Sequence, residues 1–235
     1  MRKLIILAVV AIPLIVLVTL PAGVITRAID TPSALGEVSG TIWSGDARWR
    51  QPGHAPLALN WRWQGGRSWQ WQAHNGQTDV VGLWQPGRAL ELSEVSGSVD
   101  LARLDLAHWF YATHPNGELD LAIDRAVLTP DAAPQVSGQV VWRDARLDGR
   151  VQEALGDIEI EFEPGDSVQL AHIRSRQVDP LRLRGRIEFD QDAYSLDLWL
   201  RAHPDRPDLA RQIGALGERQ PDGQVRIELR GATGW

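Results

Sequence analysis

The sequence predicts a mainly β protein. A single N-terminal transmembrane helix precedes an antiparallel, twisted sheet of about ten to twelve short strands, with one or two short helices. Three observations predict this class. Segments of alternating apolar and polar residues recur along the chain, separated by clusters of glycine and proline. One face of most segments is polar, which favours an open half-barrel or groove over a closed, fully buried barrel. An uncharged apolar run precedes all of these segments.

The first of these elements is the apolar run at residues 4–24, which matches the roughly 20 residues that span a bilayer as a helix. Arg2 and Lys3 precede it, so the positive-inside rule puts the N-terminus in the cytoplasm and the rest of the chain in the periplasm. A cleaved signal peptide is the alternative, although Leu20-Pro21-Ala22 is a poor cleavage site. The expected organisation is a cytoplasmic tip (1–3), an anchor (4–24), a linker (25–36) and a periplasmic β-domain (37–235).

A glycine-centred unit then introduces the first strand, at Val38-Ser39-Gly40, and recurs at Val95-Ser96-Gly97 and Val136-Ser137-Gly138. A looser copy is Leu183-Arg184-Gly185. Each copy keeps the period-2 alternation of a strand but puts glycine where a side chain would stand. The unit therefore predicts strands that approach a neighbour closely and bend or bulge at the glycine.

The clearest hairpin follows, with arms at residues 57–63 and 69–73 and a turn at residues 65–68. The alternation places four indoles on one face: Trp61, Trp63, Trp69 and Trp71. Paired across the hairpin, such aromatic side chains stabilise a sheet by roughly 0.2–1 kcal/mol per pair. Two roles remain open for these residues, namely core packing and a binding face for protein, glycan or lipid.

The remaining elements follow the same alternation. Further strands are expected near residues 80–84, 90–99, 119–123, 136–145, 158–163, 168–170, 181–189, 194–200 and 225–229. One short helix is expected within residues 100–110. The other is expected at Asp208–Leu216, where apolar residues have helical spacing and Gly217 suits the C-terminal end.

Composition limits the function. A net charge of -6 without basic blocks beyond the N-terminus argues against nucleic acid as a partner. The absence of cysteine excludes disulfides, thiolate metal ligands and a cysteine nucleophile. The chain has 11 tryptophans against 3 phenylalanines and 2 tyrosines. Any account of the fold has to give this excess of tryptophan a position.

No catalytic motif is present, and no cofactor or metal is expected. The glycine-rich turn at residues 65–68 lacks the lysine of a phosphate-binding loop. Five carboxylates at strand spacing are interpreted as a solvated strand face rather than as a calcium or acid–base site: Asp120, Asp124, Glu159, Glu161 and Glu163. An envelope hydrolase would require two or more of His108, His114, Asp120 and Asp124 to converge in one pocket. The sequence therefore predicts a protein that is not an enzyme.

Several short blocks, in order along nearly the whole chain, carry a resemblance to a known family. They are Leu20-Pro21-Ala22, Val38–Gly45, Gly138–Trp142 with Ala145, Leu155-Gly156, Leu183-Arg184-Gly185, Ala193–Leu198 and Asp222-Gly223. On these blocks the chain resembles protein N of the type II (general) secretion pathway. The stretch Gly40-Thr41-Ile42-Trp43-Ser44-Gly45 is the most specific part. The tryptophan-rich hairpin departs from the family pattern, so no family role is carried onto it.

The resemblance implies a single-span protein of the inner membrane whose β-domain lies in the periplasm. It implies an accessory component of the machinery that exports folded proteins across the outer membrane, with other inner-membrane components of that machinery as partners. Glycine repeats also occur in AsmA-like periplasmic proteins, so lipid or glycolipid handling by an apolar sheet groove remains the alternative function. The candidate partner-binding residues are Trp43, Trp61, Trp63, Trp69 and Trp71.

Overall fold

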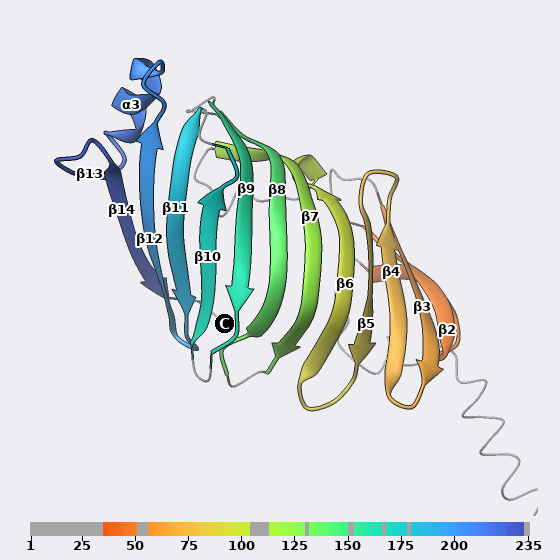
Figure 1. Cartoon of the computed structure of the whole chain (residues 1–235). Helices are drawn as coiled ribbons and strands as arrows, with labels where there is room; N and C mark the ends of the chain where they lie inside the picture. The colour runs from red at the N-terminus through yellow and green to blue at the C-terminus, as the bar shows by residue number, and fades with distance from the viewer. Residues whose placement is uncertain are drawn as a thin grey trace, which may run out of the picture. The chain divides into compact units, whose positions relative to one another are not determined.

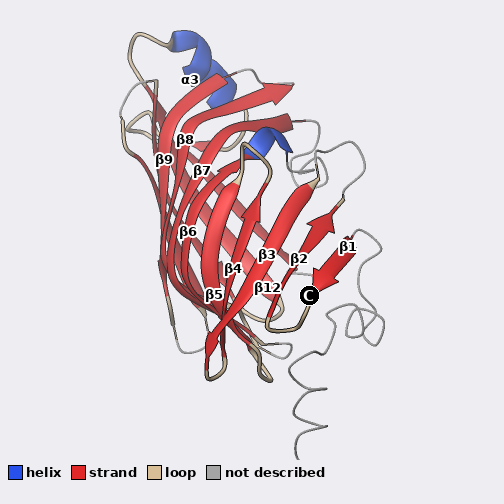
Figure 2. Cartoon of the chain, turned by 90° about the vertical axis from the view of Figure 1, so that its right-hand side faces the viewer, coloured by secondary structure: helices blue, strands red, loops and turns tan. Residues whose placement is uncertain are grey.

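Antiparallel strands dominate the computed structural model, which describes residues 35–50, 56–103, 113–129, 132–149, 153–165, 168–177 and 180–232 (Figures 1 and 2). Within these ranges the chain forms fourteen strands and few helices, which confirms a mainly β, antiparallel and open architecture. The predicted anchor at residues 4–24 lies outside the described residues. None of the described helices is long and apolar enough to cross a membrane.

The chain divides into two compact units, residues 1–76 and 77–235. The first unit is an antiparallel meander in which each strand pairs with the next. Its strands are β1 (Leu35–Gly40), β2 (Ser44–Trp49), β3 (Leu57–Gly65) and β4 (Ser68–His74). The predicted hairpin is confirmed as β3 and β4, joined by a turn at Gly65–Ser68.

The second unit is an open antiparallel sheet whose long strands curve along their length (Figure 1). Consecutive strands pair up to β12, which then pairs with β14, and the two-residue β13 covers only the start of β14. The strands are β5 (Asp79–Gln85), β6 (Leu90–Asp100), β7 (Thr113–Leu128), β8 (Gln135–Gly149), β9 (Glu153–Glu163), β10 (Gln169–Ser175), β11 (Leu181–Phe189), β12 (Ala193–Ala202), β13 (Glu218–Arg219) and β14 (Val225–Ala232).

Two short helices lie among the described residues of this unit, as expected. The first, η1, is a single 3₁₀ turn at Leu101–Arg103. The second, α3, spans Pro207–Ile213 and ends earlier than the sequence predicts, because Gly214 rather than Gly217 occupies its C-terminal cap. Its buried residues Leu209 and Ile213 pack with side chains of β11, β12 and β14 to form a small core.

One face of the second unit is apolar and the other is charged. A single row of register partners crosses nine strands: Val80, Gly97, Leu121, Val140, Ile160, Ile173, Gly185, Leu198 and Ile227. Residues one position away point to the opposite face. There, ion pairs join Arg143 to Asp120, Arg174 to Glu159, and Arg226 to Asp197. The predicted wet face is confirmed.

The glycine-centred repeat also behaves as predicted. Gly138 has φ +128°, and a Cβ placed there would lie 2.6 Å from Ile123 Cα on the neighbouring strand. The register between β7 and β8 shifts beside it, between Ile123 and Arg125. Only glycine allows both this backbone angle and this approach. The repeat is thus an architectural device of the sheet.

Candidate functional site

Five tryptophans gather on one face of the first unit, in two rows across its strands. Trp63 of β3 lies opposite Trp69 of β4, and Trp61 lies opposite Trp71. Trp43 extends the first row, because the Trp63 amide donates to the Trp43 carbonyl at 2.6 Å. Since register partners share a face, the prediction that four indoles line one face of the hairpin is confirmed. We call Trp43, Trp61, Trp63, Trp69 and Trp71 the tryptophan cluster.

Trp43 contacts one tryptophan from each strand of the hairpin, Trp63 of β3 and Trp69 of β4. Its ring meets Trp63 edge-on, with centroids 5.1 Å apart and planes at 62°. It stacks on Trp69, with centroids 6.2 Å apart and planes at 14°. Both are favoured aromatic geometries, each contributing about 0.5–1.5 kcal/mol beyond the buried area. Trp43, Trp63 and Trp69 therefore form an ordered group of aromatic rings.

The segment that carries Trp43 also provides acceptors for the hairpin indoles. Trp61 Nε1 donates to the Thr41 carbonyl at 3.0 Å, and Trp69 Nε1 donates to the Ile42 carbonyl at 3.0 Å. The Thr41 hydroxyl in turn accepts from the amides of Trp43 and Ser44, both at 3.2 Å. Threonine thus holds the turn whose carbonyls fix two of the rings.

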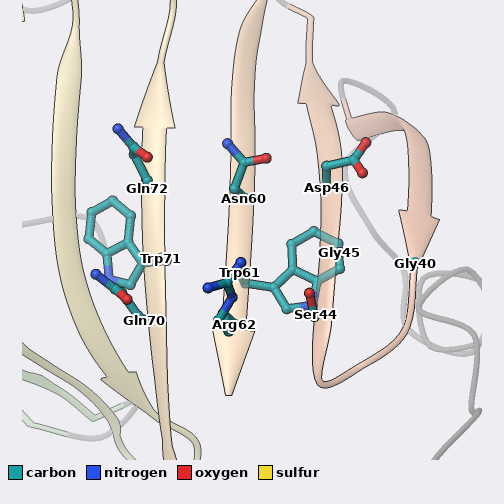
Figure 3. Close-up of a pocket in the computed structure, with 10 residues that line it drawn as sticks. All are labelled: Gly40, Ser44, Gly45, Asp46, Asn60, Trp61, Arg62, Gln70, Trp71 and Gln72. Atoms are coloured by element: carbon teal, nitrogen blue, oxygen red, sulfur yellow. The ribbon is translucent and has the colours of Figure 1, made fainter. Parts of the chain in front are cut away.

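Gly45 completes the fit between this segment and the hairpin. The Trp61 ring reaches across from β3 to β2 and lies over Gly45 (Figure 3). A Cβ on Gly45 would lie 2.9 Å from Trp61 Cε2 and closer still to another ring carbon. Thr41, Trp43 and Gly45 of the most family-specific stretch therefore each make a contact that accounts for the type of residue at that position.

The exposed part of this face is also aromatic. Trp63 is 43% exposed, and Trp49, which is 37% exposed, lies further along β2 on the same face. The other four rings of the cluster are half-buried. Contact with Trp43 thus holds the Trp63 ring in place while part of that ring stays exposed.

An open concavity of about 580 Å³ lies within the same unit (Figure 3). Its lining is mainly polar and comprises Gly40, Ser44, Gly45, Asp46, Asn60, Trp61, Arg62, Gln70, Trp71 and Gln72. The Trp71 indole nitrogen is buried and has no hydrogen-bond partner among the described residues. A buried donor without an acceptor costs about 1–3 kcal/mol.

The structure does not bring together the residues named for an envelope hydrolase in the part of the chain that it describes. His108 lies outside that part, and His114 is exposed on β7. His114 and Asp120 lie six residues apart on the same strand, about 20 Å at strand spacing. No group of three or more potential metal ligands occurs among the described residues.

Glu159 corrects one expectation, because it is buried rather than solvated, at 8% exposure, whereas Glu161 and Glu163 are exposed. Arg174 forms an ion pair with it, and Arg176 Nε donates to its carboxylate at 3.0 Å. The hydrogen bond from Arg174, followed by that from Arg176, lowers the pKa of Glu159 below its ordinary value. The residue is a structural anion on the charged face.

The comparisons with known proteins identify one family. A family model described as type II secretion system (T2SS), protein N, matches residues 32–228, which include segments of both units. No curated protein and no solved structure matched the chain.

Proposed function

The chain belongs to the type II secretion system protein N family, and on that premise we propose that it is a non-enzymatic accessory component of this system. In this proposal residues 4–24 anchor it in the inner membrane and the β-units lie in the periplasm. There it contributes to the export of folded proteins across the outer membrane. The observation that carries the proposal is the family match over residues 32–228.

The tryptophan cluster is the surface we assign to partner binding. Tryptophan is enriched at interface hot spots because a rigid ring covers a large area at little entropic cost. Trp63 is 43% exposed, while contact with Trp43 and a hydrogen bond from its indole to the Gly66 carbonyl at 3.2 Å hold its ring. Trp49 provides a second exposed indole on the same face. The partners we propose are other inner-membrane components of the secretion machinery.

The test is a secretion assay in the host bacterium. Deletion of the coding sequence should make a type II substrate accumulate inside the outer membrane, and the wild-type chain should restore its release. Trp63→Ser should restore release poorly at equal protein level. Leu128→Ser, at a residue of similar exposure (41%) in the second unit, serves as the matched control and should restore it fully. Normal secretion in the deletion strain would contradict the accessory role.

A second candidate function is lipid handling, and the apolar face of the second unit favours it. The nine-strand row from Val80 to Ile227 runs without a charged side chain. Several of its side chains are only half-buried, Ile173 and Leu198 among them. An acyl chain laid on this face would bury them at about 25 cal/mol per Å².

Photo-crosslinking in cells tests this second candidate. A photoreactive residue at Leu198, on the apolar face, should yield a phospholipid or glycolipid adduct. The same residue at Arg184, exposed on the charged face, should not. Equal labelling at the two positions, or none at either, would contradict lipid handling.

A further inference from the structure

The outer edge of β14 is an incompletely covered strand at one side of the second unit (Figure 1). β13 pairs with it only at Val225 and Arg226. In the part of the chain that the structure describes, residues 227–232 pair with β12 alone. Such an edge presents unpaired amide and carbonyl groups that another strand can bind.

The apolar exposure of the unit is concentrated at the same edge. Leu216 is 56% exposed and Leu229 is 50% exposed, the two highest values among the large apolar residues that the structure describes. Both line a concavity of about 250 Å³ together with Arg226, Ile227 and Glu228. Exposed apolar side chains beside an open strand edge are typical of a docking surface.

The sequence of this edge is complementary to itself. If a second copy pairs antiparallel about a two-fold axis through Leu229, each Leu229 lies opposite its equivalent. Glu228 then lies opposite Arg230 of the second copy, and this ion pair occurs twice. Among the described residues of its own chain, Glu228 also pairs with Arg226, whereas Arg230 has no ion-pair partner. Opposite charges directly across a strand pair are stabilising.

No neighbouring register is equally good. A shift by two residues puts Glu228 opposite Glu228 or, in the other direction, Arg230 opposite Arg230, and like charges in these positions repel. A shift by one residue puts Leu229 opposite a charged residue and reverses the faces. The symmetric register pairs residues 227–231, which lie within the stretch 227–232 that β13 leaves unpaired.

We propose that the chain forms a two-fold symmetric homodimer by antiparallel pairing of β14 with β14 of a second copy, centred on Leu229. The axis is perpendicular to the sheet, so the apolar face of one copy continues into that of the other. The paired segment is short, and the dimer therefore depends on concentration. This inference does not rest on the secretion role.

Cysteine crosslinking of the full-length chain tests the register, since the native sequence has no cysteine. Directly opposite residues have Cα atoms about 4.5–5.5 Å apart, within disulfide range. Leu229→Cys should therefore give an oxidised dimer. Glu228→Cys alone should not, because its equivalents lie about 8 Å apart in this register. A mixture of Glu228→Cys and Arg230→Cys chains should crosslink to each other.

Charge reversal tests the same contact without a covalent bond. Arg230→Glu should lower the dimer fraction of full-length protein in detergent by about tenfold, because it places Glu opposite Glu228. The double variant Glu228→Arg with Arg230→Glu should restore dimerisation. A monomeric Leu229→Cys chain, equal crosslinking from Glu228→Cys, or failure of the double variant to restore the dimer would overturn the proposal.

Discussion

Gly45→Ala should destabilise the first unit although it adds only one methyl group. The new Cβ would lie 2.9 Å from Trp61 Cε2 and in closer conflict with the Ser39 carbonyl oxygen on β1. Neither a strand backbone nor an indole hydrogen-bonded to the Thr41 carbonyl can move freely. Overpacking of this kind costs about 1–3 kcal/mol. At this chain length, that is a fall of roughly 2–12 °C in melting temperature.

Thermal unfolding followed by tryptophan fluorescence and near-ultraviolet circular dichroism measures the effect. Gly36→Ala is the matched control, because it is also in β1–β2 pairing and has no atom within 4 Å of its new Cβ. Its melting temperature should stay within about 2 °C of wild type, the usual range for a surface change. Equal melting of the two variants would refute the close fit between Gly45 and Trp61.

Two further predictions concern the cluster and the charged face. Trp43→Ala should lower the free energy of unfolding, measured in urea, by about 3 kcal/mol. Trp49→Ala, at a residue with 37% exposure, should lower it by less than about 1 kcal/mol. Equal losses in the two variants would contradict the bridging role of Trp43. Arg174 and then Arg176 favour the charged carboxylate of Glu159 and lower its pKa in the folded protein. The stability that this carboxylate contributes should therefore be present above its ordinary pKa of 4.5 and be lost as pH falls through the lower pKa of the folded protein. Glu159→Gln should therefore weaken the acid dependence of the melting temperature below pH 4.5, and an unchanged dependence would contradict the pairing.

The strands were predictable because their alternation is local. Alternation and turn residues located the hairpin and predicted that its four indoles share one face. The structure adds the register, in which Trp61 lies opposite Trp71 and Trp63 lies opposite Trp69. The repeated glycines predicted that neighbouring strands approach closely, and the contacts at Gly138 confirm it. The sequence did not reveal the short extent of α3, because Gly214 and Gly217 are both acceptable caps by composition alone.

The candidate site was only partly predictable. Trp43 and the hairpin were recognised separately, and their contact depends on pairing between β2 and β3, which alternation alone does not specify. In the structure the contact follows from the register between these strands. Ser44 pairs with Arg62, so Trp43, one residue before Ser44, lies beside Trp63. Burial of Glu159 was missed because a carboxylate at strand spacing has the same pattern whether solvated or paired with arginine.

Site-specific photo-crosslinking in actively secreting cells tests the assignment of the tryptophan cluster most directly. A photoreactive residue at Trp63 is predicted to crosslink to an inner-membrane component of the secretion system, identified by mass spectrometry. The same residue at Leu128, of similar exposure, is predicted to give no such product. Crosslinks to that component from Leu128 but not from Trp63 would contradict the account.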